Sequence, residues 1–342
     1  MPAPDVPAAE VPAAEVPAPE VSVVVSSYER PESLARLLEA LAGQSLGADR
    51  FEVIVVDNGS GPATAAALDR IAARSPLRLN RIRHERTLGP AGGRNSGWRA
   101  ARAPLIAFTD DDCRPLPGWL AGLLRAHAAG PRPGELTIVQ GRTDPDPADL
   151  ARLRRTLWAR VVSVQAADGR YETCNILYPR TLLQRLGGFD DSLLPRGLRA
   201  APVGEDTDLG WRARALGARA VFAADALVHH EVVDLGPWGK LAHTTRWAGA
   251  VHLFRLHPAA REILFRRLFW NVWHYMLLRA LLSLAGPRWL SRLLLTRYLR
   301  AMRGRAAECG AGTWAVPYLV LEDLLECVAL AGASLQERTA VL

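Results

Sequence analysis

The fold is decided by residues 21–60, which read VSVVVSSYERPESLARLLEALAGQSLGADRFEVIVVDNGS. Two apolar, β-branched runs, residues 21–27 and 51–57, are typical of strands buried on both faces of a sheet. Pro31 suits the first turn of a helix between them. One face of that helix is marked by Leu34, Leu37, Leu38 and Leu41. A strand, a helix and a second strand in this order predict a parallel sheet covered by helices.

The alternation of strand and helix continues beyond this stretch. A second helix is expected through Ala65, Leu68 and Ile71. The further expected elements are a strand near 78–84, a glycine-rich turn at 89–97, a helix to about 102, a strand at 104–109, a helix near 148–166, strands at 218–224 and 226–230, and helices from 236 to 342. The expected fold class is α/β, a mostly parallel sheet flanked by helices that forms one domain over residues 21–235, with a C-terminal helical region over residues 236–342.

Composition excludes several classes of protein. The chain has 342 residues, 49% of them hydrophobic and 23% charged, which excludes wholesale disorder. Its length suggests about two domains, or one large α/β domain with an appendage. Its four cysteines form no C-x-x-C pair, so zinc or redox chemistry is not indicated and a reducing compartment fits. Residues 1–20 repeat V-P-A-A-E and lack the apolar stretch of a secretion signal. We expect a disordered leader there and a cytoplasmic protein.

Charge is distributed unevenly along the chain. The net charge is +7, made up of −4 in residues 1–20, +3 in residues 21–235 and +8 in residues 236–342. The nearly neutral middle carries no signature of a nucleic-acid-binding module, so no nucleic-acid partner is expected. The basic C-terminal region suits contact with anionic lipid or phosphate.

Carboxylates follow the strand at 104–109 directly, at Asp110, Asp111 and Asp112. In open α/β sheets, ligands bind beyond the carboxyl ends of the strands. Three adjacent carboxylates repel one another unless a cation lies among them, and hard oxygen ligands suit Mg²⁺ or Mn²⁺. A solvated helix N-terminus, where Asp is favoured, is the alternative explanation.

A second acidic group, GEDTD at residues 204–208, follows some 95 residues later. Acids that open a helix are common because they complement its dipole. Taken together, the two groups suggest a division of roles, in which one holds a metal and the other supplies a general base.

Five ordered motifs resemble the inverting, nucleotide-sugar-dependent glycosyltransferases of family two, which have the GT-A fold. The motifs are VSVVVSSYERPESL, VIVVDNGS, GPAGGRNSGWRAARAPLIAFTDDDC, TCNILYPRTLLQRLGGFD and GEDTDLGWRARALGARAVFAADALVHH. The resemblance covers residues 21 to about 257. Glu29 stands where the family usually has Asn, and HTTRW (residues 243–247) matches the Q-x-x-R-W of processive members only at its Arg and Trp. The second departure argues against processive polymerisation.

The resemblance implies a donor site. Ser26, Tyr28 and Asp57 would border the nucleotide base, and Arg94 would face the diphosphate. The implied partner is a nucleotide-sugar donor whose base and sugar the residues do not specify.

The resemblance also implies a metal and its ligands. Asp110 and Asp112 match the outer carboxylates of the family's DxD motif, one near the ribose and one on the metal, with Asp111 as a substitute. His230, at the end of ALVHH, matches a histidine that completes the metal shell in some members. A surface histidine at a strand end is the alternative reading of His230.

The catalytic base would be Asp206, with Glu205 as the second choice. It would take the proton of the acceptor hydroxyl in a single inverting displacement. Arg246 and Trp247 of HTTRW would lie on the acceptor side, where the acceptor is a sugar, a lipid-linked molecule or a small molecule. A protein of another class, one that keeps the fold but only binds carbohydrate or membrane, is the alternative.

The C-terminal region has two possible uses. Its longest charge-free apolar stretch, residues 268–278, has 11 residues, whereas a spanning helix needs about 20. Residues 240–305 contain 13 bases and a single acid, Glu262, interleaved with Trp and Leu. Such a segment suits the inner face of a membrane. A helical subdomain on the acceptor side, with buried tryptophans, is the other possibility.

Overall fold

The computed structural model describes residues 18–130, 136–155, 157–191 and 203–342. The leader expected over residues 1–20 lies outside the described residues except for its last three. Glu20 is held against the protein, because its backbone N–H donates to the carbonyl of Arg50 at 2.8 Å. Its carboxylate also forms an ion pair with the Arg50 guanidinium at 2.5 Å.

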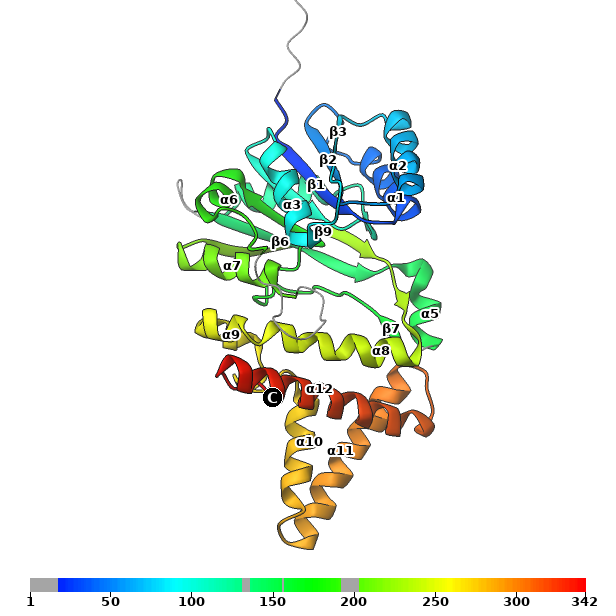
Figure 1. Ribbon diagram of the computed structural model, residues 1–342, viewed down its shortest axis with the longest axis vertical. Helices are drawn as coiled ribbons and strands as arrows, with labels where there is room; N and C mark the ends of the chain where they lie inside the picture. The colour runs from blue at the N-terminus through cyan, green and yellow to red at the C-terminus, as the bar shows by residue number, and fades with distance from the viewer. Residues whose placement is uncertain (1–17, 131–135, 156, 192–202) are drawn as a thin grey trace, which may run out of the picture.

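An eight-stranded sheet lies at the centre of the fold, in the order β3-β2-β1-β4-β8-β6-β9-β5 (Figure 1). The strands are β1 (Val21–Ser27), β2 (Phe51–Asp57), β3 (Leu79–Arg83), β4 (Leu105–Thr109), β5 (Cys113–Pro115), β6 (Thr137–Pro145), β8 (Asn175–Pro179) and β9 (Arg219–His230). Strands β3, β2, β1 and β4 are parallel, as are β6 and β9. Strand β8 is antiparallel to both neighbours, and β5 is antiparallel to β9. The expected mostly parallel sheet is therefore confirmed.

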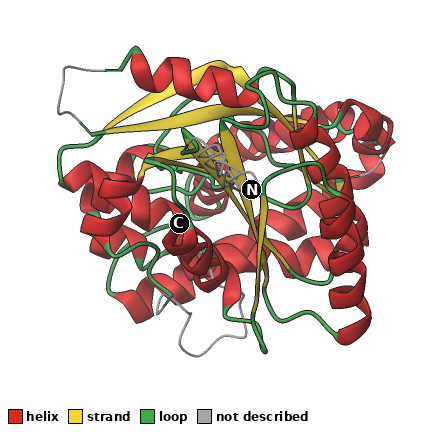
Figure 2. Cartoon of the chain, turned by 90° about the horizontal axis from the view of Figure 1, so that it is seen from above, coloured by secondary structure: helices red, strands yellow, loops and turns green. Residues whose placement is uncertain are grey.

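Helices cover both faces of this sheet (Figures 1 and 2). The helices before residue 236 are α1 (Pro31–Ala42), α2 (Pro62–Arg74), α3 (Gly89–Ala100), α4 (Trp119–Ala128), α5 (Leu150–Arg155), α6 (Arg180–Leu186) and α7 (Glu205–Ala215), with the 3₁₀ turn η1 (Pro147–Asp149). Alternate residues of β1 point to opposite faces, so Val23 and Val25 share an apolar cluster with α1, α2 and α4, while Val24 shares one with α3, α6 and α7.

The glycine-rich turn expected at residues 89–97 is wrong, because helix α3 already begins at Gly89. These glycines allow the helix to approach β1 closely. A Cβ on Gly93 would lie 2.1 Å from the Ser26 hydroxyl oxygen, and a Cβ on Gly97 would lie 2.4 Å from Val24. These glycines are therefore needed to let the helix pack closely on the strand, not to turn the chain.

The helix expected near residues 148–166 is also largely wrong. It ends at Arg155, and the two-residue strand β7 (Ala159–Arg160) pairs with β10 (Val233–Asp234). Val164 then pairs with Thr143 of β6 through two backbone hydrogen bonds of 2.9 and 3.0 Å. Pairing with distant strands overrides the local helical pattern here. Similarly, the two strands expected at 218–224 and 226–230 form one strand, β9.

The C-terminal region is helical, as expected. Its elements are α8 (Gly236–Thr244), η2 (Thr245–Ala250), α9 (Leu253–Leu256), η3 (Pro258–Ile263), α10 (Val272–Ser283), α11 (Arg288–Glu308), η4 (Thr313–Ala315) and α12 (Val316–Glu337). Leu330 and Ala333 of α12 belong to the same apolar cluster as Val24 of β1. The division at residue 235 into two domains therefore stays a prediction. Among the helices described, none combines the length and apolar character that crossing a membrane requires.

Candidate active site

The carboxyl ends of β1, β2 and β4 meet at one edge of the sheet. Ser27 and Asp57 are register partners at the ends of β1 and β2. The Ser27 hydroxyl donates a hydrogen bond of 2.7 Å to the Asp111 carboxylate, just beyond the end of β4. The chain leaves β1 for β2 on one side and reaches β4 on the other, so this edge is a topological switch point, where open α/β sheets bind ligands.

A cavity of about 290 Å³ opens at this edge. Four of the residues expected to bind the donor line it, namely Ser26, Tyr28, Arg94 and Asp111. Tyr28 is half-exposed and stands at the rim. The structure therefore brings these four side chains together around one space.

Asp57, which was also expected to border the nucleotide base, is fully buried. Its carboxylate accepts a hydrogen bond from the Ser60 backbone N–H at 3.0 Å and one from Arg81 at 3.3 Å. Arg83 lies 3.9 Å away. The carboxylate is thus turned toward the arginines of β3, and its contact with a nucleotide base stays a prediction.

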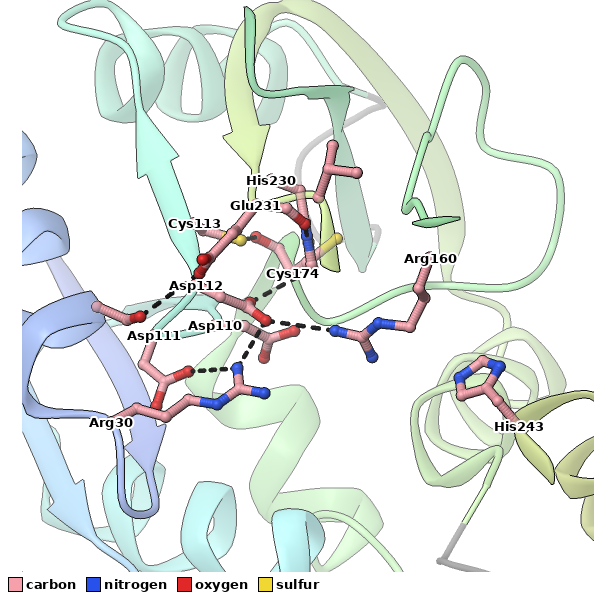
Figure 3. Close-up of polar contacts among 12 residues, drawn as sticks. Arg30, Asp110, Asp111, Asp112, Cys113, Arg160, Cys174, His230, Glu231 and His243 are labelled. Atoms are coloured by element: carbon pink, nitrogen blue, oxygen red, sulfur yellow. Dashed lines mark hydrogen bonds and ion pairs between the residues drawn. The ribbon is translucent and has the colours of Figure 1, made fainter. Parts of the chain in front are cut away.

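The three aspartates after β4 have three different sets of partners, and Figure 3 shows those of Asp111 and Asp112. Asp110 accepts a hydrogen bond of 2.9 Å from Arg94. Asp111 faces Ser27 and Arg30, while Asp112 pairs with Arg30 at 2.7 Å. Arg160 of β7 and His230 of β9 also reach Asp112, at 3.4 and 3.3 Å.

These partners determine how the carboxyl groups ionise. Burial alone would raise the pKa of Asp110, but the Arg94 guanidinium outweighs it and holds this pKa below its usual range. Burial raises the pKa of Asp111 to about 6, against the opposing effect of the Ser27 hydrogen bond. Neighbouring carboxylates in one turn therefore hold their protons with different strengths.

Asp112 and His230 fit a divalent cation. The ligand atoms of Asp112, Cys113 and His230 lie within 4.8 Å of one another. The His230 Nδ1 lies 2.9 Å from the Glu231 carbonyl oxygen, a contact in which Nδ1–H donates, so Nε2, which faces Asp112, is the ring nitrogen placed to bind a metal. Burial raises the pKa of the Cys113 thiol well above its usual range, so this sulfur stays protonated and is a poor ligand. A carboxylate oxygen and an imidazole nitrogen are suitable donors for Mn²⁺ or Mg²⁺.

Helix α7 brings the second acidic group to the same edge. Gly204, with φ +96°, precedes the helix, and a Cβ there would lie 2.4 Å from Leu253. Only glycine fits this turn without strain. Arg94 then donates one hydrogen bond to Glu205 and one to Asp110, both 2.9 Å long. One guanidinium therefore joins the two acidic groups that the sequence separates by 95 positions.

Asp206 differs from Glu205 in its surroundings. Its carboxylate accepts a hydrogen bond of 2.7 Å from the backbone N–H of Thr207, in its own helix. Burial, with the charge of Glu205 added, raises the pKa of Asp206 to about 8. A carboxylate whose pKa lies near neutral pH has the proton affinity that a general base needs.

The HTTRW segment lies at the end of α8 and the start of η2. Arg246 interacts electrostatically with Glu205 and Asp206. It donates a hydrogen bond of 2.7 Å to His243 Nε2, and its guanidinium lies 4.7 Å from the centre of the Trp247 ring. Burial and the charge of Arg246 lower the pKa of His243 to about 4, so this imidazole is neutral and accepts.

Three polar residues of this site were missed by sequence analysis. Arg30 follows Tyr28 within the first motif, so its position was a usable signal. Arg160 had none, because its segment was expected to be helical. Glu172 belongs to the loop before β8, where burial raises its pKa to about 7. The charge of Glu172 helps to raise the pKa of Asp206, so Glu172 belongs to the electrostatic surroundings of the site.

Two family models match the chain. The model for glycosyl transferase family 2 matches residues 22–181. The model for glycosyl transferase family group 2 matches residues 105–327, which is more than half of the chain.

Curated relatives share part of their length with this chain. Pre-mycofactocin glycosyltransferase from Mycobacterium tuberculosis is 28% identical over 218 residues, which cover 62% of this chain and 42% of the relative. Validoxylamine A glucosyltransferase from Streptomyces hygroscopicus subsp. jinggangensis is 30% identical over 228 residues, covering 58% and 52%. The chain thus spans about half the length of the curated relatives it matches.

Solved structures show the same fold. The mannosyltransferase PcManGT from Pyrobaculum calidifontis, solved with GDP-Man and Mn²⁺, superposes with a TM-score of 0.61 at 20% identity, over 91% of this chain and 87% of that one. TarS 1-349 from S. aureus superposes with a TM-score of 0.50 at 15% identity, over 93% and 91%. Together with the family models, these likenesses show that the chain belongs to glycosyltransferase family two and has the GT-A fold.

Proposed function

We propose that this glycosyltransferase moves a sugar from a nucleotide-diphosphate donor to an acceptor hydroxyl by a single inverting displacement. The observation that carries the proposal is the position of Arg94. Its guanidinium lines the donor cavity and bonds both Asp110 and Glu205. The donor cavity and the N-terminus of α7, which bears Asp206, are therefore held side by side.

In this proposal the donor's diphosphate lies against Arg94, beside the Asp triplet, and its base lies near Ser26 and Tyr28. Asp112 and His230, with Asp110 beside them, would hold a divalent cation, which supplies positive charge to the departing diphosphate. Arg94 adds a fixed charge to the same phosphate oxygens as the bond to the anomeric carbon breaks. GDP-Man and Mn²⁺ in the structure of PcManGT, which has the same fold, support a nucleotide sugar and a divalent metal here.

Asp206 acts on the other reactant. As the acceptor oxygen attacks the anomeric carbon, Asp206 takes the proton of its hydroxyl group, and the sugar inverts its configuration. Glu205 is less suited to this role because it is already paired with Arg94. It positions the arginine instead. Arg246 and Trp247 border the space for the acceptor, whose identity these residues do not define.

We propose a cytoplasmic location for this reaction, at the inner face of a membrane. All four cysteines are free thiols, which suits a reducing compartment. The basic C-terminal helices, with a net charge of +8, favour anionic lipid as a neighbour.

Metal-dependent nucleotide binding tests the donor site. We expect a nucleoside diphosphate with Mn²⁺ to raise the melting temperature, since a ligand at 100 times its Kd adds about 2.7 kcal/mol to stability. Asp112→Asn should reduce this shift, whereas the exposed Asp225→Asn, on the same strand as His230 but far along it, should not. An equal shift in the presence of a chelator would contradict the metal role. The configuration of the product's anomeric carbon, read by NMR, tests inversion.

A further inference from the structure

The α10–α11 hairpin projects from the body of the protein, at the end opposite the sheet (Figure 1). Residues 279–297 are termed the hairpin tip. Six consecutive residues in it, 284–289 (LAGPRW), are exposed. The exposed fractions of Leu282, Leu284 and Trp289 are 67%, 63% and 67%. Large apolar side chains gathered on a projecting hairpin indicate a contact surface.

Only cations accompany these apolar side chains. Between Glu262 and Glu308 the sequence contains no Asp or Glu. From α10 to the end of α11, the exposed arginines are Arg279, Arg288, Arg292, Arg297, Arg300 and Arg303. Positions i and i+4 lie on one side of a helix, so Arg288 and Arg292 extend together from the first turns of α11. The charge of the tip therefore complements a surface rich in phosphate.

Helix α12, which packs against α10 and α11, has its polarity inverted. Three of its four acids, Glu322, Asp323 and Glu326, are buried, with Asp323 paired to Arg305 at 2.8 Å and Glu326 to His274 at 3.0 Å. Its exposed residues include Leu321, Leu324, Val328 and Leu335. Helix α1, by contrast, buries its leucines against the sheet. Helix α12 thus pairs its buried charges in the interior and exposes apolar side chains, as proteins do at a boundary with lipid.

The length of the hairpin limits how deeply it can enter a bilayer. Helix α10 has 12 residues, which at 1.5 Å per residue is about 18 Å. The hydrocarbon core of a bilayer is about 30 Å thick. A hairpin of this length can reach into one leaflet and return, with the arginines near the phosphates.

We propose that the hairpin tip docks on an anionic membrane surface. Leu282, Leu284 and Trp289 enter the interfacial region of the bilayer, and Arg288 and Arg292 contact lipid phosphates. A second copy of the chain fits this surface less well, because two tips that both carry only arginines repel each other. The docking does not depend on the transfer reaction, so each can be tested without the other.

Vesicle co-sedimentation of the full chain tests the inference. The vesicles are phosphatidylcholine alone and equal parts of phosphatidylcholine and phosphatidylglycerol, each at low and high salt. The test variant is Arg288→Gln/Arg292→Gln. The matched control is Arg70→Gln/Arg74→Gln, which removes the same charge from exposed positions of α2. Nucleoside diphosphate binding by each variant shows that it is folded.

The full chain should pellet with the anionic vesicles at low salt and be released at high salt, because screening shortens the reach of surface charges. Each arginine near anionic lipid is worth about fivefold in partitioning, so the test variant should bind roughly 25-fold more weakly and the control nearly as well as wild type. Trp289→Ser should also weaken binding, and Trp289 fluorescence should shift to the blue on binding.

Three results would overturn the inference. They are no pelleting with anionic vesicles, equal losses in the two double variants, and a concentration-dependent dimer that Trp289→Ser dissociates without any vesicle binding. The last result would assign the tip to a second copy of the chain. Failure of nucleotide binding alongside intact vesicle binding would instead count against the proposed transferase and leave the docking intact.

Discussion

Asp110 and Asp112 each lie against a guanidinium, whereas Asp206, at the other acidic group of the site, accepts its described hydrogen bonds from Thr207 of its own helix. Both groups are close to Arg94, yet the pKa of Asp110 is lowered and the pKa of Asp206 is raised. Burial acts to raise both pKa values, so the difference comes from the neighbouring charges: Arg94 bonds Asp110, whereas the charge of Glu205 adds to the raised pKa of Asp206. The Asp110 carboxylate, held by a guanidinium, suits ligand binding, while Asp206, beside another carboxylate, is suited to exchanging a proton.

Removing the Asp206 carboxylate should have the largest effect of the substitutions that test how the two acidic groups differ. Asp206→Asn should lower kcat by about 10²- to 10⁴-fold, the usual cost of losing a general base, and leave nucleoside diphosphate binding intact. Glu205→Gln should instead weaken donor binding, because it releases Arg94. Transfer assays and nucleotide titrations of both variants measure the two effects, with the exposed Asp225→Asn as control. Full activity in Asp206→Asn would transfer the role to another carboxylate.

Removing Arg94 tests whether its guanidinium stabilises the two carboxylates that it bonds, Asp110 and Glu205. Arg94→Gln leaves Asp110 and Glu205 without the guanidinium that each bonds at 2.9 Å. Breaking a buried ion pair by removing one partner costs about 3 to 5 kcal/mol, so the free energy of unfolding should fall by that order. Arg99→Gln, from the exposed side of the same helix, is the matched control and should change stability by less than about 1 kcal/mol. Denaturant titration measures both, and equal stability of the two variants would refute the bridging role.

Local patterns predicted much of this site, and long-range packing accounts for what they missed. The β-branched run at 21–27 and the aspartates after residue 109 carry their signal within a few residues, so both could be placed at a strand end. Arg160 could not, because its segment becomes a strand only by pairing with Val233. Likewise, Gly93 is needed in α3 because the helix passes close to Ser26 of β1, and this contact cannot be seen in the local sequence.

The C-terminal helices show the same limit. Their abundance of tryptophan is visible in the sequence, but not the direction in which each side chain points. Trp273 packs against the apolar cluster of α10, α11 and α12, whereas Trp289 is two-thirds exposed. The two positions differ in tertiary contacts rather than in local sequence, so only the structure separates a buried residue from a docking residue.

The smallest expected effect is on stability and depends on pH. The pKa of Asp206 is about 8 in the folded protein and about 3.9 in an unfolded chain. Between these values the folded state binds more protons, so ionising Asp206 costs stability progressively as pH rises and the cost is complete above about pH 8. Asp206→Asn removes this cost because the amide cannot ionise.

The variant should therefore match wild type in stability near pH 4 to 5 and exceed it increasingly up to pH 8. Solvent around the half-buried carboxylate limits the gain to about 1 to 2 kcal/mol. Thermal unfolding of both proteins across this pH range, with Asp225→Asn as control, measures the difference. A constant difference in stability across the range would mean that Asp206 ionises normally and that its neighbours do not hold its proton. Because the same variant is expected to lose transfer, a gain in stability at pH 8 would also show that the inactive enzyme is fully folded.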